Sequence, residues 1–120
     1  MSWNLFGKKK LHVLAASRND AVRQALAERH DDGSAVRHVI HFAYPDTDTN
    51  LSMRTQIMAD LKARGFEVRD AAADNGVVFE HHRAVAADDF DDFTDDLEAW
   101  FREGGWKYDG WECAVISRRN

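Results

Sequence analysis

Residues 104–113 read GGWKYDGWEC, and this stretch joins the last helix of the predicted fold to its last strand. The pair Gly104-Gly105 ends the helix, because glycine adopts the left-handed conformation that closes helices at little cost. Asp109-Gly110 is a turn pair, so we expect a bend or bulge where the chain enters the strand. Beyond it, we expect Trp111 to anchor the strand in the core and Glu112 to point away.

The same stretch holds the single cysteine of the chain, Cys113, among acids and aromatics. A cysteine that shares a strand face with Trp111 and Val115 is typically an inert buried thiol. No serine lies in a recognisable nucleophile motif, and the sequence has no phosphate-binding glycine loop. The stretch therefore indicates architecture rather than chemistry, and we expect no catalytic residues.

Two segments before this stretch predict long helices. Residues 87–103 carry apolar residues at helical spacing on one face. These are Phe90, Phe93, Leu97, Trp100 and Phe101. Residues 51–65 carry a second stripe, and Gly65 ends that helix. The members of the second stripe are Leu51, Ile57, Met58 and Leu61.

Apolar or alternating runs predict four strands, at 35–44, 66–72, 77–85 and 107–117. Asp74-Asn75-Gly76 predicts a tight turn between the second and third strands. The first strand divides into two alternating sets of side chains. One set is Val36, His38, Ile40, Phe42 and Tyr44, and the other is Arg37, Val39, His41 and Ala43. We expect the first, more apolar set to face the core.

A shorter helix precedes the first strand. The run Ser17-Arg18-Asn19-Asp20 has the form of a capping box, which predicts a helix that begins after Ser17. The segment "HDDGS" predicts its end, with Gly33 in the left-handed position.

The order of elements after this helix is strand–helix–strand–strand–helix–strand. With right-handed crossovers, this order predicts a ferredoxin-like α+β sandwich, with a four-stranded antiparallel sheet and two helices on one face. The first and third strands are expected at its centre. We expect an N-terminal segment at residues 1–33, with the extra helix, and a ferredoxin-like domain at residues 34–120.

The strongest compositional signal is a local acidic run. The whole chain of 120 residues has a net charge of -5, yet residues 88–98 contain seven acids and no base, which leaves +2 for the remainder. The seven are Asp88, Asp89, Asp91, Asp92, Asp95, Asp96 and Glu98. Two interpretations stay open: a surface that docks a basic protein segment, or a plain solvated helix face. The net charge disfavours direct nucleic-acid binding.

Histidines on neighbouring strands give a second, weaker signal. If His41, Glu80 and His82 all face outward, two imidazoles and a carboxylate could hold a divalent metal. The alternative is an ordinary polar sheet face, and this is the more common situation. We therefore expect no metal or other cofactor, and keep the triad as a minor hypothesis.

The cellular compartment is inferred from what the sequence lacks. One cysteine cannot form an internal disulfide, which fits a reducing compartment. No run is long enough for a secretory signal or a membrane span. We expect a cytoplasmic protein without a membrane partner.

The run from Gly104 to Glu112, with Tyr108-Asp109-Gly110-Trp111-Glu112 at its end, resembles the "GGxYDGWE" ending of the regulator of ribonuclease activity B (RraB) family. Two other pieces resemble the family in the same order, "VRHVIHFAYPDTDT" and "LKARGFEV". The resemblance covers about residues 34–116. It implies a ferredoxin-like fold and a structural role for Gly104, Gly105 and the five residues Tyr108 to Glu112.

The resemblance also implies a function. It suggests a non-enzymatic regulator of RNA metabolism that binds RNase E, the major endoribonuclease of bacterial RNA decay, through its scaffold region and inhibits it. Such scaffold regions are rich in arginine, for which an acidic helix is a suitable counterpart. Two alternatives remain: a ligand- or metal-binding domain, with or without enzymatic activity, that uses the open sheet face, and a homodimeric structural module. The sequence does not identify the oligomeric state.

Overall fold

The structure is a computed structural model that describes residues 8–86 and 88–117. The chain forms two units. The sheet unit consists of Arg37–Arg83 and Leu97–Ala114. The helix unit consists of the residues up to Val36, Ala84–Asp96 and the residues from Val115 onward.

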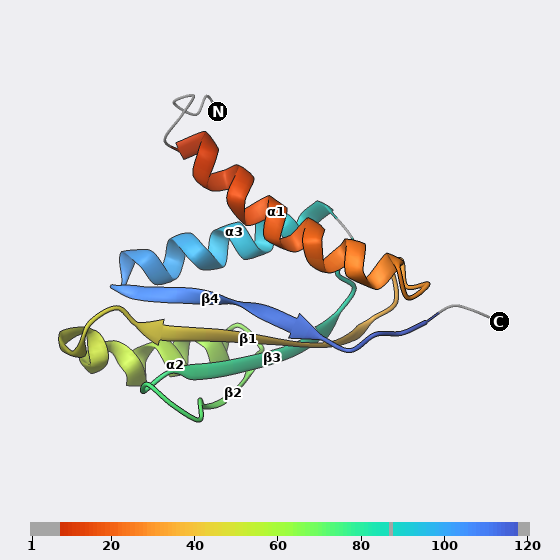
Figure 1. The fold of residues 1–120 in the computed structure, drawn as a ribbon. Helices are drawn as coiled ribbons and strands as arrows, with labels where there is room; N and C mark the ends of the chain where they lie inside the picture. Colours follow the sequence, from red (N-terminus) through yellow and green to blue (C-terminus); the bar gives the residue numbers. More distant parts are fainter. Residues whose placement is uncertain (1–7, 87, 118–120) are drawn as a thin grey trace. The chain divides into compact units, whose positions relative to one another are not determined.

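The elements follow the predicted order (Figure 1). In chain order they are α1 (Lys8–Ala27), β1 (Arg37–Pro45), the 3-10 helix η1 (Asp48–Met53), α2 (Arg54–Ala63), β2 (Glu67–Asp70), β3 (Val77–Arg83), α3 (Asp88–Glu103) and β4 (Trp106–Cys113). The four strands form one antiparallel sheet in the order β2-β3-β1-β4. The predicted α+β class, with a ferredoxin-like sandwich and an additional N-terminal helix, is confirmed, and the first and third strands are central.

An aromatic core fills one face of the sheet. Phe79 on β3 lies 5.6 Å from Phe101 of α3, measured between ring centroids, and 5.1 Å from Phe66, edge to face. Phe101 in turn stacks on Tyr108 of β4. These contacts use the favourable geometries of aromatic pairs, and each ring removes a large apolar area from water.

The predicted face of β1 is wrong. Arg37, Val39, His41 and Ala43 are buried, whereas the set predicted for the core is partly exposed, and Val36 is 66 % exposed. The reason is the size of the side chains that the other elements place on the inner face. Because large rings from β3, β4 and α3 already occupy that space, β1 contributes small side chains and a hydrogen-bonded histidine there. Arg37 is accommodated because its guanidinium donates to the carbonyl of Ala114.

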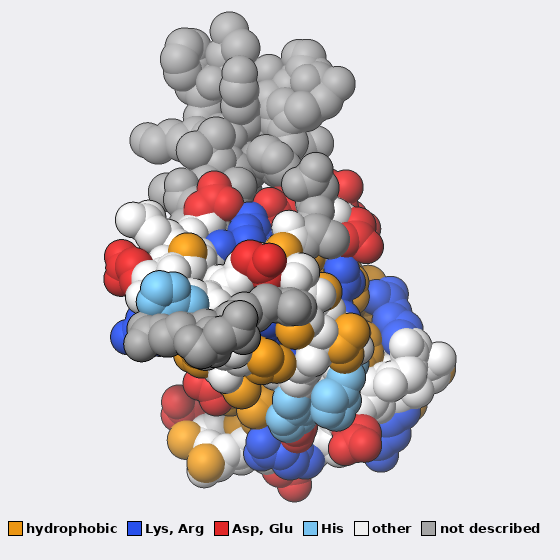
Figure 2. Space-filling view, turned by 90° about the vertical axis from the view of Figure 1, so that its right-hand side faces the viewer, with side chains coloured by type: hydrophobic (Ala, Val, Ile, Leu, Met, Phe, Trp, Pro, Cys, Tyr) orange, Lys and Arg blue, Asp and Glu red, His pale blue; other side chains and the backbone are white. Residues whose placement is uncertain are grey.

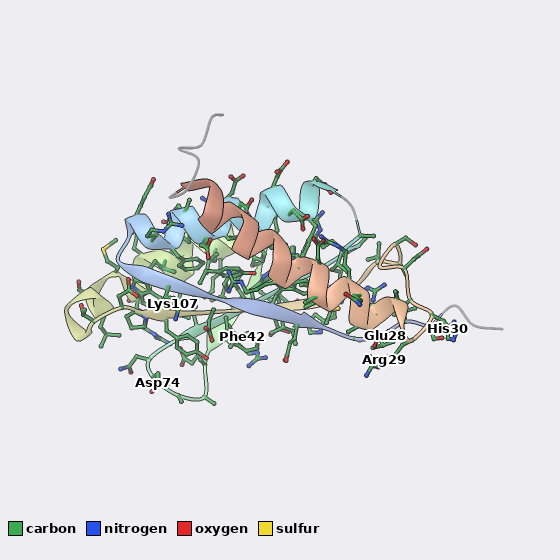
Figure 3. The ribbon with its side chains drawn as sticks, turned by 45° about the horizontal axis from the view of Figure 1, so that its top comes forward. Glu28, Arg29, His30, Phe42, Asp74 and Lys107 are labelled. Atoms are coloured by element: carbon green, nitrogen blue, oxygen red, sulfur yellow. The ribbon has the colours of Figure 1, made fainter. Side chains whose placement is uncertain are left out.

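Two turns have the predicted chemistry. Asp74 and Asn75 have φ values of 60° and 57°, and the amide of Gly76 donates to the carbonyl of Ala73, which is a type I′ turn between β2 and β3 (Figure 3). Gly65, with φ of 99°, ends α2 as predicted.

The predicted bulge in β4 is confirmed. His41 pairs with Trp111 and Ala43 pairs with Tyr108, so three steps along β4 match two along β1. Gly110 has φ of 96° at this point, where glycine is the residue of least strain. The extra residue keeps Tyr108 and Trp111 on the same sheet face, although they are an odd number of positions apart.

The depth of the anchors differs from the prediction. Trp106 and Tyr108 are 1 % and 4 % exposed, whereas Trp111 is only half-buried and Glu112 is exposed. Trp106 and Tyr108 therefore hold β4 in the core more deeply than Trp111 does. Gly104-Gly105 follows α3 directly, as predicted, and Gly105 has φ of 75°.

The leading helix is longer than predicted, and it ends differently. Ser17 lies inside α1, which begins at Lys8, so the capping-box prediction is wrong. The lysines, leucines and alanines before Ser17 favour helix, and they extend it in the N-terminal direction. The left-handed residue after α1 is His30, with φ of 62° (Figure 3), while Gly33 takes its positive φ in the following turn.

A buried carboxylate organises that turn. Asp31 is 1 % exposed and accepts hydrogen bonds from the amides of Gly33 at 2.9 Å and Ile116 at 2.8 Å. The carbonyl of Gly33 accepts from the amides of Val85 and Ala86. Three separate chain segments of the helix unit therefore meet at this point. No helix among the described residues is long and apolar enough to cross a membrane.

Candidate functional site

The predicted acidic surface lies on α3, but its members have different environments. Asp91 is engaged within the helix unit: it accepts hydrogen bonds from Asn19 at 2.8 Å and from Arg23 at 2.9 Å. Asn19 also donates to the hydroxyl of Thr94 at 2.8 Å. Arg23 reaches Asp20 and the carbonyl of Val85 as well. Asp91 therefore joins α1 to α3 and is poorly available to a partner.

Electrostatics strengthen this junction. Burial works against the charge of Arg23, but the hydrogen bonds and charges of Asp91 and Asp20 outweigh it and raise the pKa of the guanidinium. The Asp91 side chain is 29 % exposed and that of Arg23 only 19 % exposed. A partly shielded, charge-assisted pair of this kind is worth more than a fully exposed one.

Three other acids form an exposed stripe. Asp89, Asp92 and Asp96 are exposed, and their spacing of three and four residues places them along one side of α3. We refer to these three residues as the acidic stripe. Asp95 and Glu98 are partly buried, and Glu98 lies 3.8 Å from Arg102; the side chain of Asp88 is outside the described residues. The stripe is the part of the predicted surface that a cationic segment can reach.

The outer face of the sheet carries a polar cluster. Glu80 on β3 bonds to His38 at 2.5 Å and to Arg69 at 2.7 Å, and the rings of His38 and His82 stack 5.0 Å apart. The hydrogen bond from Arg69, followed by that from His38, lowers the pKa of Glu80. Figure 2 shows histidine side chains gathered at the surface beside acidic and basic ones. The cluster is a charge-balanced network.

The inner face carries a second histidine pair, which the sequence pattern did not predict. His41 is 0 % exposed; its Nδ1 lies 2.8 Å from the hydroxyl of Tyr108 and its Nε2 lies 2.9 Å from Nε2 of His81. Its ring also stacks on Phe79 at 4.9 Å. Burial, with the nearby charges of His81 and Arg83, lowers the pKa of His41 to about 3. Both imidazoles are therefore neutral near pH 7 and form a hydrogen-bonded chain with the tyrosine.

His81 is the more exposed end of this hydrogen-bonded series of Tyr108, His41 and His81. Burial, followed by the charges of Arg83, His82 and His38, lowers its pKa to about 4. The only sequence signal for the pair was the alternation along β3, which places His81 on the face opposite His82. With β1 assigned to the wrong face, that alternation led to the wrong partner.

The hypothesis of a metal site at His41, Glu80 and His82 is wrong. His41 lies on the inner face, whereas Glu80 and His82 lie on the outer face with His38. Among the described residues, no group of three or more histidine, cysteine or carboxylate side chains could hold a metal ion.

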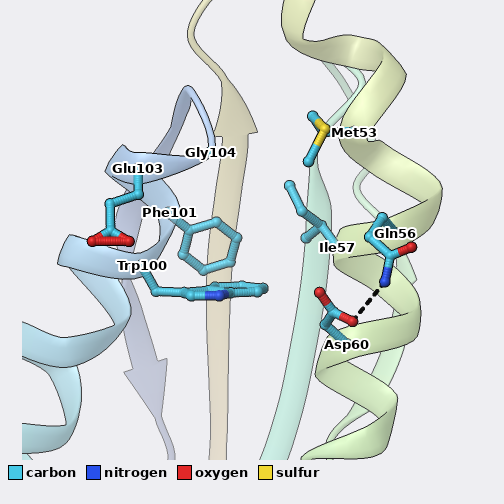
Figure 4. A pocket seen from close by; sticks show the side chains of 8 residues that line it. All are labelled: Met53, Gln56, Ile57, Asp60, Trp100, Phe101, Glu103 and Gly104. Atoms are coloured by element: carbon cyan, nitrogen blue, oxygen red, sulfur yellow. Dashed lines mark hydrogen bonds between the residues drawn. The ribbon is translucent and has the colours of Figure 1, made fainter.

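A pocket lies between α2 and the last turns of α3, within the sheet unit (Figure 4). Its volume is about 240 Å³. The residues that line it are Met53, Gln56, Ile57, Asp60, Trp100, Phe101, Glu103 and Gly104. The apolar stripe of α3 predicted Trp100 and Phe101 as core residues. The gap between the helices depends on tertiary packing, so the stripe alone could not reveal it.

The comparisons with known proteins add one finding. The family model described as "Regulator of ribonuclease activity B" matches residues 16–113. The match covers α1 from Ala16 onward, all four strands and both other α-helices, and it agrees with the resemblance found at residues 104–112. A search of curated proteins gives no match.

Proposed function

The chain belongs to the regulator of ribonuclease activity B family, and from this premise we propose that it binds an RNase E-type endoribonuclease through the enzyme's scaffold region and inhibits or modulates it. The family supports a regulator of ribonuclease activity in general. The partner and the binding surface are our proposal. We infer that the protein acts by binding, without a catalytic step of its own.

The observation that carries this proposal is the acidic stripe. Asp89, Asp92 and Asp96 are exposed in a segment that holds seven acids, while the rest of the chain is slightly basic. Like charges that are concentrated on one helix raise the local concentration of a cationic partner and accelerate association. Scaffold segments rich in arginine are disordered and basic, and a helix face of this kind suits them.

Binding of this type gives a physical route to regulation. A disordered segment that becomes ordered on the acidic stripe is no longer accessible to the other proteins that it recruits. The regulator then alters ribonuclease activity without contacting the catalytic centre. The ordering entropy reduces the affinity, so we expect reversible binding that weakens as salt is added.

The test is a pull-down with the purified scaffold region at rising salt, using the full chain. Reversal of two charges, Asp92→Lys with Asp96→Lys, is expected to weaken binding by about tenfold or more, since mutated charges alter steering and complementarity. The matched control reverses two exposed acids elsewhere, Glu28→Lys with Glu67→Lys, and is expected to change binding much less. Absence of binding at low salt would reject the partner, and equal effects of the two pairs would reject the surface.

One observation favours a second candidate, a homodimer through the outer sheet face. Ile40, Phe42 and Tyr44 of β1 are only half-buried there. Half-exposed apolar side chains on an open sheet are a typical place for association. Light scattering over a range of concentrations tests it: a constant monomer mass would remove this candidate.

A further inference from the structure

The pocket between α2 and α3 has apolar walls and an acidic rim. Met53 and Ile57 form one wall and Trp100 and Phe101 the other, as Figure 4 shows. Asp60 points across the gap toward the Trp100 ring (Figure 4). Glu103 lines the opposite side. We refer to this site as the Trp100 pocket.

The dimensions of the Trp100 pocket fit one side chain. Its volume of about 240 Å³ lies below the roughly 300–1,000 Å³ of sites for drug-sized ligands. Phe101 and Ile57, one in each wall, are 1 % and 4 % exposed, so both walls are part of the packed core. Met53 at the mouth is 41 % exposed and accessible to a partner. The site therefore suits an anchor side chain of a peptide better than a free metabolite.

The rim of the pocket has unused negative charge. Asp60 accepts a hydrogen bond from Gln56 at 2.7 Å, which leaves its second oxygen for another donor. Within the part of the chain that the structure describes, neither Asp60 nor Glu103 forms an ion pair with a cation. A cationic group that enters the pocket would therefore meet two carboxylates without first breaking an existing ion pair.

The aromatic wall already accepts a guanidinium. The Cζ atom of Arg64 lies 4.6 Å from the centroid of the Trp100 ring, which is cation–π geometry. Tryptophan is the best aromatic partner for such contacts, and the planar guanidinium stacks on it while it donates to carboxylates. Lysine has a compact, strongly hydrated charge and lacks this planar fork.

From these features we propose that the Trp100 pocket receives one arginine side chain of a basic protein segment. Its methylene stem lies against Met53 and Ile57, and its guanidinium lies beside the carboxylate of Asp60, on the face of Trp100 that Arg64 does not cover. Glu103 adds further negative charge at the rim. This inference deepens the proposed function and rests on it for the identity of the partner. It adds a specific anchor to the non-specific attraction of the acidic stripe.

The experiment is an NMR titration of the full chain with three short peptides that differ at one position: arginine, lysine or citrulline, the uncharged analogue of arginine. The arginine peptide is expected to shift the Trp100 indole N–H and the Met53 methyl signal. The lysine peptide is expected to bind more weakly, and the citrulline peptide to give no saturable shift. Equal affinity for arginine and citrulline would overturn the proposal.

Two variants test the rim without disturbing the core. Asp60→Asn, which keeps an acceptor for Gln56, and Glu103→Gln are each expected to weaken arginine-peptide binding about three- to fivefold, the range of a partly exposed charge pair. The matched control, Glu67→Gln, removes an exposed acid of β2 and is expected to leave the affinity unchanged. An equal loss of arginine-peptide affinity in all three variants would mean that the peptide responds only to the overall charge of the protein, and this would reject the pocket.

The outcome is separable from that of the proposed function. If peptide shifts occur only in the amides of residues 89–96, the acidic stripe binds and the Trp100 pocket does not. If the pocket signals shift with the arginine peptide while the scaffold region fails to bind, the pocket stands and the partner is wrong. If the pocket signals shift on concentration of the protein alone, a second copy occupies the site, which also overturns the proposal.

Discussion

The two units of the chain are stabilised by different kinds of interaction. In the sheet unit, the ring centroid of Phe79 lies 5.1 Å from that of Phe66 and 5.6 Å from that of Phe101, and burial of these rings contributes much of the stability. In the helix unit, α1 is joined to the first turns of α3 by polar contacts of Asn19 and Arg23 with Asp91. The helix unit also buries Leu26, Val85 and Phe90, and it adds this polar junction between its two helices.

This difference shows why only part of the acidic run is available for binding. In the helix unit the carboxylate of Asp91 is paired with Arg23. Asp91 therefore stabilises the fold and is not available to attract a partner. In the sheet unit Glu80 is paired with His38 and Arg69, whereas the carboxylates of Asp60 and Glu103 keep capacity for a donor. A count of acids in the sequence therefore overstates the docking surface, and the environment of each acid decides its use.

The largest effect is expected in the aromatic core. Phe79→Ala is expected to reduce the free energy of unfolding by about 3–5 kcal/mol, because a fully buried ring is lost and a cavity remains. Urea denaturation followed by circular dichroism measures it. Phe42→Ala on the outer face of β1, where the ring is only half-buried, is the matched control, with a loss of less than half that size. Similar losses at both positions would mean that stability does not reside on one sheet face.

Local signals in the sequence were sufficient for most of the fold. Asp74-Asn75-Gly76 fixed a type I′ turn because few other residues adopt two consecutive positive φ values. Asp109-Gly110 marked the bulge for the same kind of reason. The strand order followed from chain order and handedness. Each of these rules involves residues that are close in sequence or is a general property of chains.

The failures involve residues whose partners are distant in sequence. The face of β1 depends on what fills the other side, and His41 is buried only because Tyr108 and His81 satisfy both of its ring nitrogens. The role of Asp91 depends on Arg23, which is 68 positions away. The Trp100 pocket depends on the gap between two helices. Periodicity within one segment contains no information on any of these contacts.

The second effect is a dependence on pH that involves the buried histidine pair. The folded-state pKa of His41 is about 3 and that of His81 about 4, both below the ordinary value of 6.5. The unfolded chain therefore binds more protons between about pH 3 and 6.5, so stability is complete above pH 6.5 and is lost as the pH falls through this window. At pH 5 we expect a loss of about 2 kcal/mol, taken from His41 alone because His81 is partly exposed and screened.

The measurement is urea denaturation at pH 7.5 and at pH 5, together with an NMR titration of the ring signals. The rings of His41 and His81 are expected to stay neutral at pH 5. A titration of His41 near pH 6 would show that water reaches the inner pair. The core of the sheet unit would then be more hydrated than its packing indicates.

The smallest effect is expected at the polar junction of the helix unit. Asn19 is 4 % exposed and donates to both Asp91 and Thr94, so Asn19→Ala leaves their oxygens without this donor and is expected to cost about 1 kcal/mol. Gln24→Ala, at an exposed position of the same helix, is the control. A double-mutant cycle with Thr94→Val isolates the coupling, which we expect to be several tenths of a kcal/mol. If Asn19→Ala lowers the free energy of unfolding as much as Phe79→Ala does, the polar junction is as important as the aromatic core. If Asn19→Ala leaves that free energy unchanged, Arg23 alone joins α1 to Asp91.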